Sequence, residues 1–196
     1  MKISGNEDLR VQRTIKNIYR AFEDLICQKD YNKITVTELA RKAEINKKTF
    51  YRYYPTLDDL LAEMQAQYSR GYIKLVENYR YPQDMKKIVR AFYEFSARQG
   101  KAYDKITTST GAYSRIRQQM INQVEKKTWE QSAEFNNLNE WQQKILLAFI
   151  QDTSIACYRE WINSNKEQSI DDMIAITSSL LEGGIEKFFK NIKQNN

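Results

Sequence analysis

Apolar residues recur along this chain at the three- and four-residue spacing of amphipathic helices, from near its start to near its end. The first such pattern predicts one long helix, with spaced apolar positions at Val11, Ile15, Ile18, Tyr19, Phe22, Leu25 and Ile26. Later patterns predict helices over about 57–79, 85–100, 101–107, 113–135, 141–162 and 171–192. No segment has the alternating pattern of a strand, so we expect an all-α protein.

Two short helices joined by a tight turn are predicted between Thr35 and Tyr54, in the segment TVTELARKAEINKKTFYRYY. Thr35 followed by Glu38 predicts a capping box at the start of the first helix. Asn46 is a good N-cap for the second helix. Ile45 is the apolar residue of the turn, and we expect it to be buried.

The second short helix is predicted to have one apolar and one polar face. Phe50 and Tyr54 are four residues apart and should both point into the core. The outward face then carries Lys47, Lys48, Tyr51 and Arg52. A short helix with cations and phenols on its exposed side suits the major groove of DNA. Short charged helices also occur as ordinary solvated surface, so this helix alone leaves both interpretations open.

The flanking residues favour DNA binding. The long helix before the pair can cover it, and Pro55 ends the second short helix. Thr56 with Asp59 predicts a further capping box for the helix that follows. The segment therefore has the organisation of a helix-turn-helix reader held between two longer helices.

This order of elements resembles the TetR family of bacterial regulators over about the first 65 residues. The residues that carry the resemblance are Ala43, Ile45, Thr49-Phe50-Tyr51, Tyr53-Tyr54 and Leu60. Glu44 stands where the family usually has a turn glycine, and Leu57 stands where it often has a lysine on the DNA backbone. The resemblance implies a three-helix helix-turn-helix DNA-binding head on a larger helical body that binds a ligand and dimerises.

We expect eight residues to contact DNA. Lys47 and Lys48 are the candidates for base edges, and Arg52 and Tyr53 are candidates for both bases and backbone. The hydroxyls of Thr37, Thr49 and Tyr51 should bind phosphates. The free backbone amides at the start of the first short helix, near Thr35, should bind phosphates as well.

Charge divides the chain at the same place. Residues 1–56 contain twelve Lys or Arg and seven Asp or Glu, a net charge of +5, whereas residues 57–196 contain nineteen and eighteen, a net charge of +1. Concentrated positive charge favours a polyanionic partner. We expect a helix-turn-helix DNA-binding domain over 1–56 and a helical effector-binding and dimerisation domain over 57–196.

The chain has no histidine, which excludes His-based triads, His general bases and His-ligated metals. Cys27 and Cys157 lie singly in apolar helical patterns, where we expect them reduced and buried. A glycine-rich phosphate loop is also absent. We therefore expect no enzymatic activity, no cofactor and no metal.

The longest apolar run, 145–150, is too short to cross a bilayer, and the N-terminus lacks a secretory-type segment, so we expect a cytoplasmic protein.

The last two predicted helices carry more apolar residues than one helix needs for packing. These residues are Ile145, Leu146, Phe149, Ile150, Ile155 and Tyr158 in the first, and Ile174, Ile176, Leu180, Leu181, Ile185, Phe188 and Phe189 in the second. Gly183 and Gly184 each cost a helix roughly 1 kcal/mol relative to alanine, which is more plausible where two backbones approach closely. Ordinary core helices would show the same pattern. TetR-type regulators pair through their last two helices, so the resemblance implies a homodimer.

Thirteen Tyr and three Trp are many for 196 residues. The aromatic residues expected around the centre of the body are Tyr68, Tyr72, Phe92, Phe95, Tyr103, Tyr113, Trp129, Tyr158 and Trp161. Such side chains can line an apolar cavity and still hydrogen-bond a ligand, although an aromatic stripe is also common in an ordinary core. The family resemblance implies an effector pocket, and the few charges on inward faces favour an apolar or aromatic effector.

The sequence thus predicts a homodimeric, ligand-responsive transcription regulator. The preferred form is a repressor that a small-molecule effector releases from palindromic double-stranded DNA. The alternative is an all-helical protein-interaction module with a decayed DNA-binding head, for which Glu44 and Leu57 are the support. That alternative predicts dimerisation without specific binding to duplex DNA.

Overall fold

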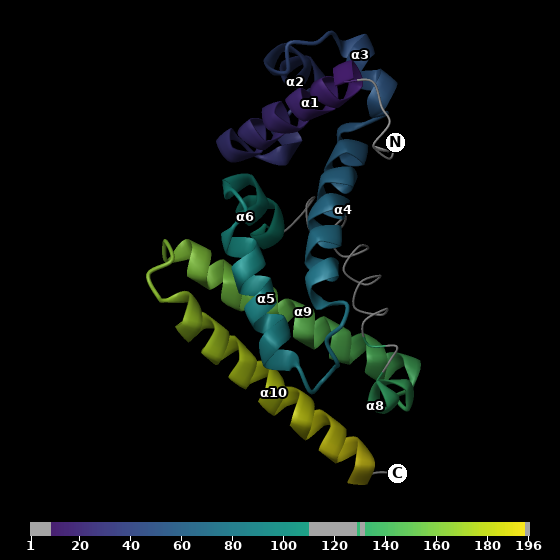
Figure 1. Ribbon diagram of the computed structural model, residues 1–196, viewed down its shortest axis with the longest axis vertical. Coiled ribbons are helices and arrows are strands. Elements are labelled where there is room, and N and C mark those ends of the chain that lie inside the picture. Colours follow the sequence, from purple (N-terminus) through teal and green to yellow (C-terminus); the bar gives the residue numbers. More distant parts are fainter. Residues whose placement is uncertain (1–8, 110–128, 130–131, 195–196) are drawn as a thin grey trace. The chain divides into compact units, whose positions relative to one another are not determined.

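The computed structural model describes residues 9–109, 129 and 132–194, and every regular element in this part of the chain is a helix (Figure 1), which confirms the all-α prediction. The elements are α1 (Leu9–Gln28), the 3₁₀ helix η1 (Tyr31–Lys33), α2 (Val36–Lys42), α3 (Lys47–Tyr53), α4 (Leu57–Val76), α5 (Met85–Ala97), α6 (Lys101–Thr108), α8 (Ala133–Asn136), α9 (Glu140–Asn163) and α10 (Ile170–Gln194). The described residues form two compact units, one within Met1–Gln67 and Lys101–Arg117, the other within Tyr68–Gly100 and Gln118–Asn196. None of the described helices is both long and apolar enough to span a membrane.

The first unit is built around α1. Its apolar residues recur at helical spacing, and the side chains of that stripe are buried: Ile15, Ile18, Ala21, Phe22, Leu25 and Ile26. α2 packs against α1, and α3 packs against α2 (Figure 1). Burial of one large apolar side chain contributes about 1.5–3 kcal/mol, so this stripe is the main source of stability for the three-helix group.

Two hydrogen bonds join the N-terminal half of α4 to α1 and η1 within the first unit. Gln67 Nε2 donates to the Tyr19 hydroxyl at 2.8 Å, and the Tyr31 hydroxyl donates to Asp58 Oδ1. Burial raises the pKa of Tyr19 far above its usual range, so this phenol stays protonated. These bonds hold the first turns of α4 against α1 and η1.

α4 begins with the predicted capping box. The Asp59 amide donates to Thr56 Oγ1 at 3.1 Å, and the Thr56 amide donates to Asp59 Oδ2 at 2.9 Å. Each side chain thus accepts a hydrogen bond from a backbone amide that has no carbonyl acceptor within the helix. The local sequence alone was sufficient to predict this helix start.

α6 belongs to the first unit, although it follows α5 in the sequence. It packs against α1, with Tyr103 buried, and Lys105 Nζ donates to the Lys29 carbonyl at 3.0 Å. Lys29 directly follows α1, and a cation is favourable there because the C-terminal end of a helix is negative. Only residues 98–100 separate α6 from α5.

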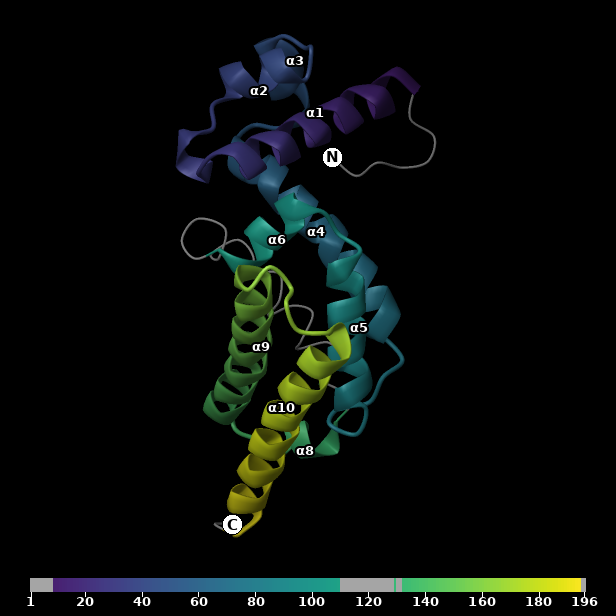
Figure 2. The same ribbon diagram turned by 90° about the vertical axis from the view of Figure 1, so that its left-hand side faces the viewer.

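The second unit contains the end of α4, from Tyr68, together with α5, α8, α9 and α10. α9 and α10 run in opposite directions, and α10 packs against both α5 and α9 (Figure 2). Aromatic rings meet between these helices: the Tyr93 centroid lies 5.8 Å from that of Tyr158 and 5.7 Å from that of Trp161. The buried Tyr93 hydroxyl lies 2.9 Å from Thr177 Oγ1. Burial raises the pKa of Tyr93 to about 12.

The prediction of one continuous helix over 113–135 is wrong at its C-terminal end. Ser132 has extended backbone, with φ −86° and ψ 119°, and its side chain accepts a hydrogen bond from the Phe135 amide. Serine at this position caps the separate helix α8 instead of continuing a longer one, as its preference for helix starts allows. Most of the remaining predicted helix, including Tyr113, lies outside the described residues.

The expectation of buried cysteines is also wrong for Cys27. Its side chain is exposed and that of Cys157 is half-buried, and both are free thiols. Leu25 and Ile26 occupy the buried stripe of α1 at this point, and the next residue turns toward solvent.

Candidate nucleic-acid interface

The start of α2 is capped by Thr35, whose side chain accepts a hydrogen bond from the Glu38 amide at 3.2 Å. The second half of the predicted capping box is not formed. The Glu38 carboxylate instead accepts from Lys29 Nζ, at 2.7 and 2.9 Å. A neighbouring ammonium is a stronger partner for a carboxylate than a backbone amide, which explains the difference.

Glu44 makes the turn between α2 and α3 with a left-handed backbone, φ 56°. The Glu44 amide donates to the Arg41 carbonyl at 3.2 Å, and the Ile45 amide donates to the Ala40 carbonyl at 2.9 Å. These two bonds form a Schellman motif, which usually has glycine at the left-handed position. The turn therefore forms without glycine, at a conformational cost to Glu44. Ile45 is half-buried, so the expectation of full burial is wrong.

α3 starts at the N-cap that the sequence predicts. Asn46 Oδ1 accepts from the Thr49 amide at 2.7 Å and from the Thr49 hydroxyl at 3.0 Å. Phe50 and Tyr54 are buried, with ring centroids 5.9 Å apart, as expected from their spacing. This packing fixes the rotation of α3 and directs its other face to solvent.

The outward face of α3 borders an open pocket of about 590 Å³. Its lining residues are Asn46, Lys48, Thr49, Tyr51 and Arg52. Four of them belong to the set predicted to contact DNA. The sequence predicts Asn46 only as a helix cap, although the N-cap position itself indicates that its side chain lies beside the exposed first turn of α3.

The cations of α3 are exposed and carry no ion pair within the described part of the chain; they are Lys47, Lys48 and Arg52. Some other cations of the same unit are paired with carboxylates. Lys29 lies 2.7 Å from Glu38, and Lys42 lies 3.2 Å from Asp24. The three cations of α3 are therefore available to a polyanion that approaches this helix.

The other predicted DNA contacts lie outside this pocket or are already engaged. Thr35 and Thr37 are exposed at the start of α2, and Tyr53 is half-buried. The Thr49 hydroxyl hydrogen is donated to Asn46, so it would have to leave the helix cap to reach a phosphate. Lys47 is exposed but does not line the pocket.

The residues predicted to bind an effector are divided between the units. Tyr103 is buried in the first unit, against α1. The described members in the second unit are Tyr68, Tyr72, Phe92, Phe95, Trp129, Tyr158 and Trp161. Several of these pack on one another: Tyr72 lies 6.1 Å from both Phe92 and Phe95, and Phe92 lies 5.4 Å from Tyr158.

α9 and α10 leave an apolar stripe on the surface of the second unit: Trp141, Ile145, Phe149, Ile176 and Leu180 are all exposed. The other apolar residues noted on these helices are buried or half-buried within the chain. A side chain at Gly184 would come within 2.5 Å of the Phe149 ring, so this glycine permits α9 and α10 of one chain to pack closely. Gly183 has open space around its Cα and remains accessible to another molecule.

Comparison with known proteins matches residues 18–64 to the family of bacterial regulatory proteins called the tetR family. An uncharacterized HTH-type transcriptional regulator of Bacillus subtilis, YxbF, is 40% identical over 58 residues, which cover 29% of this chain. The chain spans 15% of the length of that relative.

Solved structures extend the similarity of fold beyond the head. A putative TetR-family transcriptional regulator from Syntrophomonas wolfei has a TM-score of 0.67 and 17% identity, with 87% of this chain and 94% of that chain covered. FadR of Bacillus subtilis, solved in complex with stearoyl-CoA, has a TM-score of 0.62 and 14% identity, with 85% and 95% covered. Residues 18–64 thus match the tetR family of bacterial regulatory proteins, and the similarity to solved structures extends the all-helical fold over most of this chain.

Proposed function

We propose that this protein is a homodimeric transcription regulator that binds a palindromic operator and represses transcription until a small-molecule effector releases it. The observation that carries the proposal is the outward face of α3, where Lys48, Tyr51 and Arg52 lie together and the cations have no carboxylate partner among the described residues. As a DNA-binding protein it would act in the cytoplasm, and no enzymatic activity is part of the proposal.

The DNA-binding head comprises residues 1–56, and α3 is its reading helix. Lys47 and Lys48 contact base edges, while Arg52 and Tyr53 contact bases or backbone. Phosphates bind the exposed hydroxyls on α2 and α3 and the amide end of α2. Glu44 does not argue for a decayed head, because the turn before α3 has its Schellman hydrogen bonds without glycine.

Dimerisation would bury the apolar stripe of α9 and α10. Ile176 and Leu180 are about half exposed on α10, and Trp141 and Ile145 continue the apolar surface on α9. A stripe of large side chains of this kind is unfavourable in water and typical of an interface between subunits. Pairing two heads also lets two half-sites be read at once, which a single short helix cannot do.

The effector-binding and dimerisation body comprises residues 57–196, and the aromatic residues between its helices are the candidates for effector contact. They favour an apolar or aromatic ligand, and long-chain acyl thioesters are a sensible first class, since the structurally similar FadR of Bacillus subtilis was solved with stearoyl-CoA. A ligand acts only if it binds the two states of the protein with different affinity.

α6 offers a route by which such a ligand could affect the head. It is joined to α5 by residues 98–100, yet it packs against α1, and Lys105 bonds the backbone just after α1. A displacement of α5 would therefore be transmitted to α1 through this short connection. Loss of the Lys105 hydrogen bond, in Lys105→Met, should weaken the response to effector more than it weakens operator binding.

The test is fluorescence anisotropy of the full chain with duplex fragments from the region upstream of its own gene. A scrambled duplex is the control, and each titration is run at two salt concentrations, because affinity for DNA depends on salt. Fragment-specific binding that survives the higher salt supports the proposal. A selection from genomic fragments then follows if no upstream fragment is preferred, and failure of both to yield a specific duplex would favour the protein-interaction alternative.

A further inference from the structure

A pocket of about 550 Å³ lies between the end of α4 and the outer side of α5, wholly within the second unit. Its apolar lining consists of Leu75, Tyr79, Ala91 and Phe95. Leu75 is about half exposed, so it presents apolar surface to the pocket. This volume falls in the range of small-molecule sites, which usually combine an apolar lining with a few polar groups.

The charged lining of the pocket has an excess of cations, with four ammonium or guanidinium groups against two carboxylates. Two of the cations are neutralised internally. Lys87 Nζ lies 2.7 Å from Asp84 Oδ1, and Arg90 Nη1 lies 3.3 Å from Glu94 Oε1. The remaining two, Lys86 and Arg98, have no side-chain partner among the described residues.

Lys86 and Arg98 lie near opposite ends of the pocket. They are twelve residues apart along α5, which corresponds to about 18 Å at 1.5 Å per residue. Arg90 and Glu94 occupy the intervening positions on the same face, because each is four residues from the next. The site is therefore elongated, with a free cation at each end and, between them, the Arg90–Glu94 ion pair beside the apolar side chains.

We propose that this pocket binds an elongated organic anion, a carboxylate or phosphate monoester with an apolar chain or ring. Lys86 or Arg98 holds the anionic group, and Leu75 and Phe95 cover the apolar part. A multivalent polyanion would not use the apolar lining, and a neutral apolar molecule would leave both cations without a partner.

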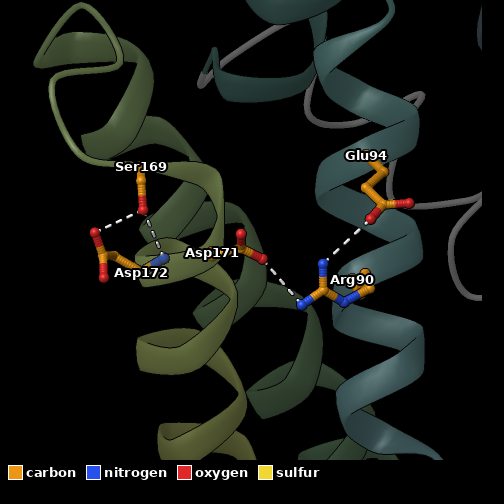
Figure 3. Close-up of polar contacts among 5 residues, drawn as sticks. All are labelled: Arg90, Glu94, Ser169, Asp171 and Asp172. Atoms are coloured by element: carbon orange, nitrogen blue, oxygen red, sulfur yellow. Dashed lines mark hydrogen bonds and ion pairs between the residues drawn. The ribbon is translucent and has the colours of Figure 1, made fainter.

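Arg90 connects the pocket to α10. Its guanidinium contacts Glu94 on its own helix and, through Nη2, Asp171 Oδ1 at the start of α10, at 3.0 Å (Figure 3). Asp171 is 72% exposed, and an ion pair this open to water is weakened by solvent screening. A ligand anion that reaches Arg90 can therefore compete with Asp171 for the same guanidinium.

The chain offers a matched pair of substitutions for this competition. Asp171→Asn removes the partner of Arg90, whereas Asp172→Asn removes the same charge one residue later. The Asp172 carboxylate faces away from Arg90 and accepts from the Ser169 hydroxyl at 2.6 Å (Figure 3). A general electrostatic effect would change the ligand affinity of both variants. Competition for Arg90 would change the ligand affinity of Asp171→Asn alone.

The experiment is isothermal titration calorimetry of the full chain with octyl phosphate, with inorganic phosphate and octyl glucoside as probes that lack the chain or the charge. Inorganic phosphate lacks the apolar chain and octyl glucoside lacks the charge, so we expect octyl phosphate to bind more tightly than either of these two probes. Loss of the cation that holds the phosphate, in Lys86→Gln or in Arg98→Gln, should weaken it roughly 3- to 10-fold, as expected for loss of one charged contact at a partly exposed site. Asp171→Asn should strengthen it roughly 2- to 5-fold, whereas Asp172→Asn and the distant Lys193→Gln should not change it.

Circular dichroism of each variant verifies that the helices are intact. The proposal is overturned if octyl phosphate shows no saturable binding up to about 1 mM, which corresponds to only about −4 kcal/mol. It is also overturned if Lys86→Gln and Arg98→Gln bind the probe as the unmodified chain does, because the ligand then occupies another site. Neither result would bear on operator binding, which is measured separately by anisotropy.

Discussion

On α3, Lys47, Lys48 and Arg52 face solvent with no carboxylate partner in the described part of the chain, whereas α9 and α10 leave Trp141, Ile145, Phe149, Ile176 and Leu180 exposed. The first surface is stable in water, because exposed cations are well hydrated, and it attracts a polyanion. The second is unfavourable in water, so covering it by an apolar partner stabilises the molecule. Two surfaces of one helical chain therefore call for different kinds of partner.

The largest effect is expected from charges placed in the apolar stripe. Ile176→Asp together with Leu180→Glu should convert a dimer to a monomer, because burial of unpaired carboxylates in an interface is strongly unfavourable. Operator affinity should fall at least about 100-fold, since two linked heads bind far more tightly than one. Size-exclusion chromatography with light scattering and anisotropy measure the two effects.

The control for the stripe is Ala175→Asp, which puts a carboxylate on an exposed position of α10 beside the stripe. It should leave both the molar mass and operator affinity unchanged. A double variant that remains dimeric would show that the stripe is not the interface and would weaken the contrast between the two surfaces.

The basic surface is tested by Lys48→Ala. We expect operator affinity to fall by about 1–3 kcal/mol, roughly 5- to 150-fold, with folding unchanged. If Lys48 reads a base, discrimination against a scrambled duplex should decrease; a phosphate contact would instead reduce the salt dependence by about one unit of slope. Lys33→Ala is the matched control, because Lys33 is exposed in the same unit and lies 3.8 Å from Asp30.

A moderate effect is expected inside the second unit from Tyr93→Phe. The variant leaves the buried Thr177 hydroxyl without its partner at 2.9 Å, which should lower the free energy of unfolding by about 1–2 kcal/mol. Urea unfolding at neutral pH measures this loss. An equal stability of both proteins would mean that the hydroxyl pair is not formed in solution.

The same variant should alter the response to alkaline pH. The folded pKa of Tyr93 is raised to about 12, whereas the unfolded residue ionises near pH 10. The stabilisation tied to the neutral phenol is therefore present below pH 10 and is lost as the pH rises from about 10 through 12. The difference in free energy of unfolding between Tyr93→Phe and the unmodified chain should therefore decrease as the pH rises from about 10 to 12.

The smallest effects are expected at the two left-handed turns. Glu44→Gly, at φ 56°, should stabilise the chain by up to about 1 kcal/mol, since glycine adopts this conformation without the steric cost. Lys166→Gly, at φ 60°, should give a smaller gain in stability, because it also removes the ammonium that lies 5.4 Å from the centroid of the Trp161 ring. Urea unfolding compares both with Glu44→Ala, which keeps the Cβ and should give no gain.

The sequence predicted local features that depend on residues close together in the chain. The starts of α3 and α4 follow from Asn46 and from Thr56 with Asp59, and the burial of Phe50 and Tyr54 follows from their spacing. The outward orientation of Lys48 and Arg52 is a consequence of that burial. These features depend on helix geometry and on capping hydrogen bonds within one turn, so neighbouring residues are sufficient to specify them.

Features that depend on distant residues required the tertiary structure. The Glu38 carboxylate binds Lys29 instead of completing its capping box, and α6 packs with α1, which is distant from it in the sequence. The same is true of Gly184, whose role is to admit the Phe149 ring, and of Arg90, which reaches across to Asp171. Each of these contacts joins side chains from separate helices. Helical periodicity specifies which face of a helix is apolar, but the partner of that face is decided only when the helices pack.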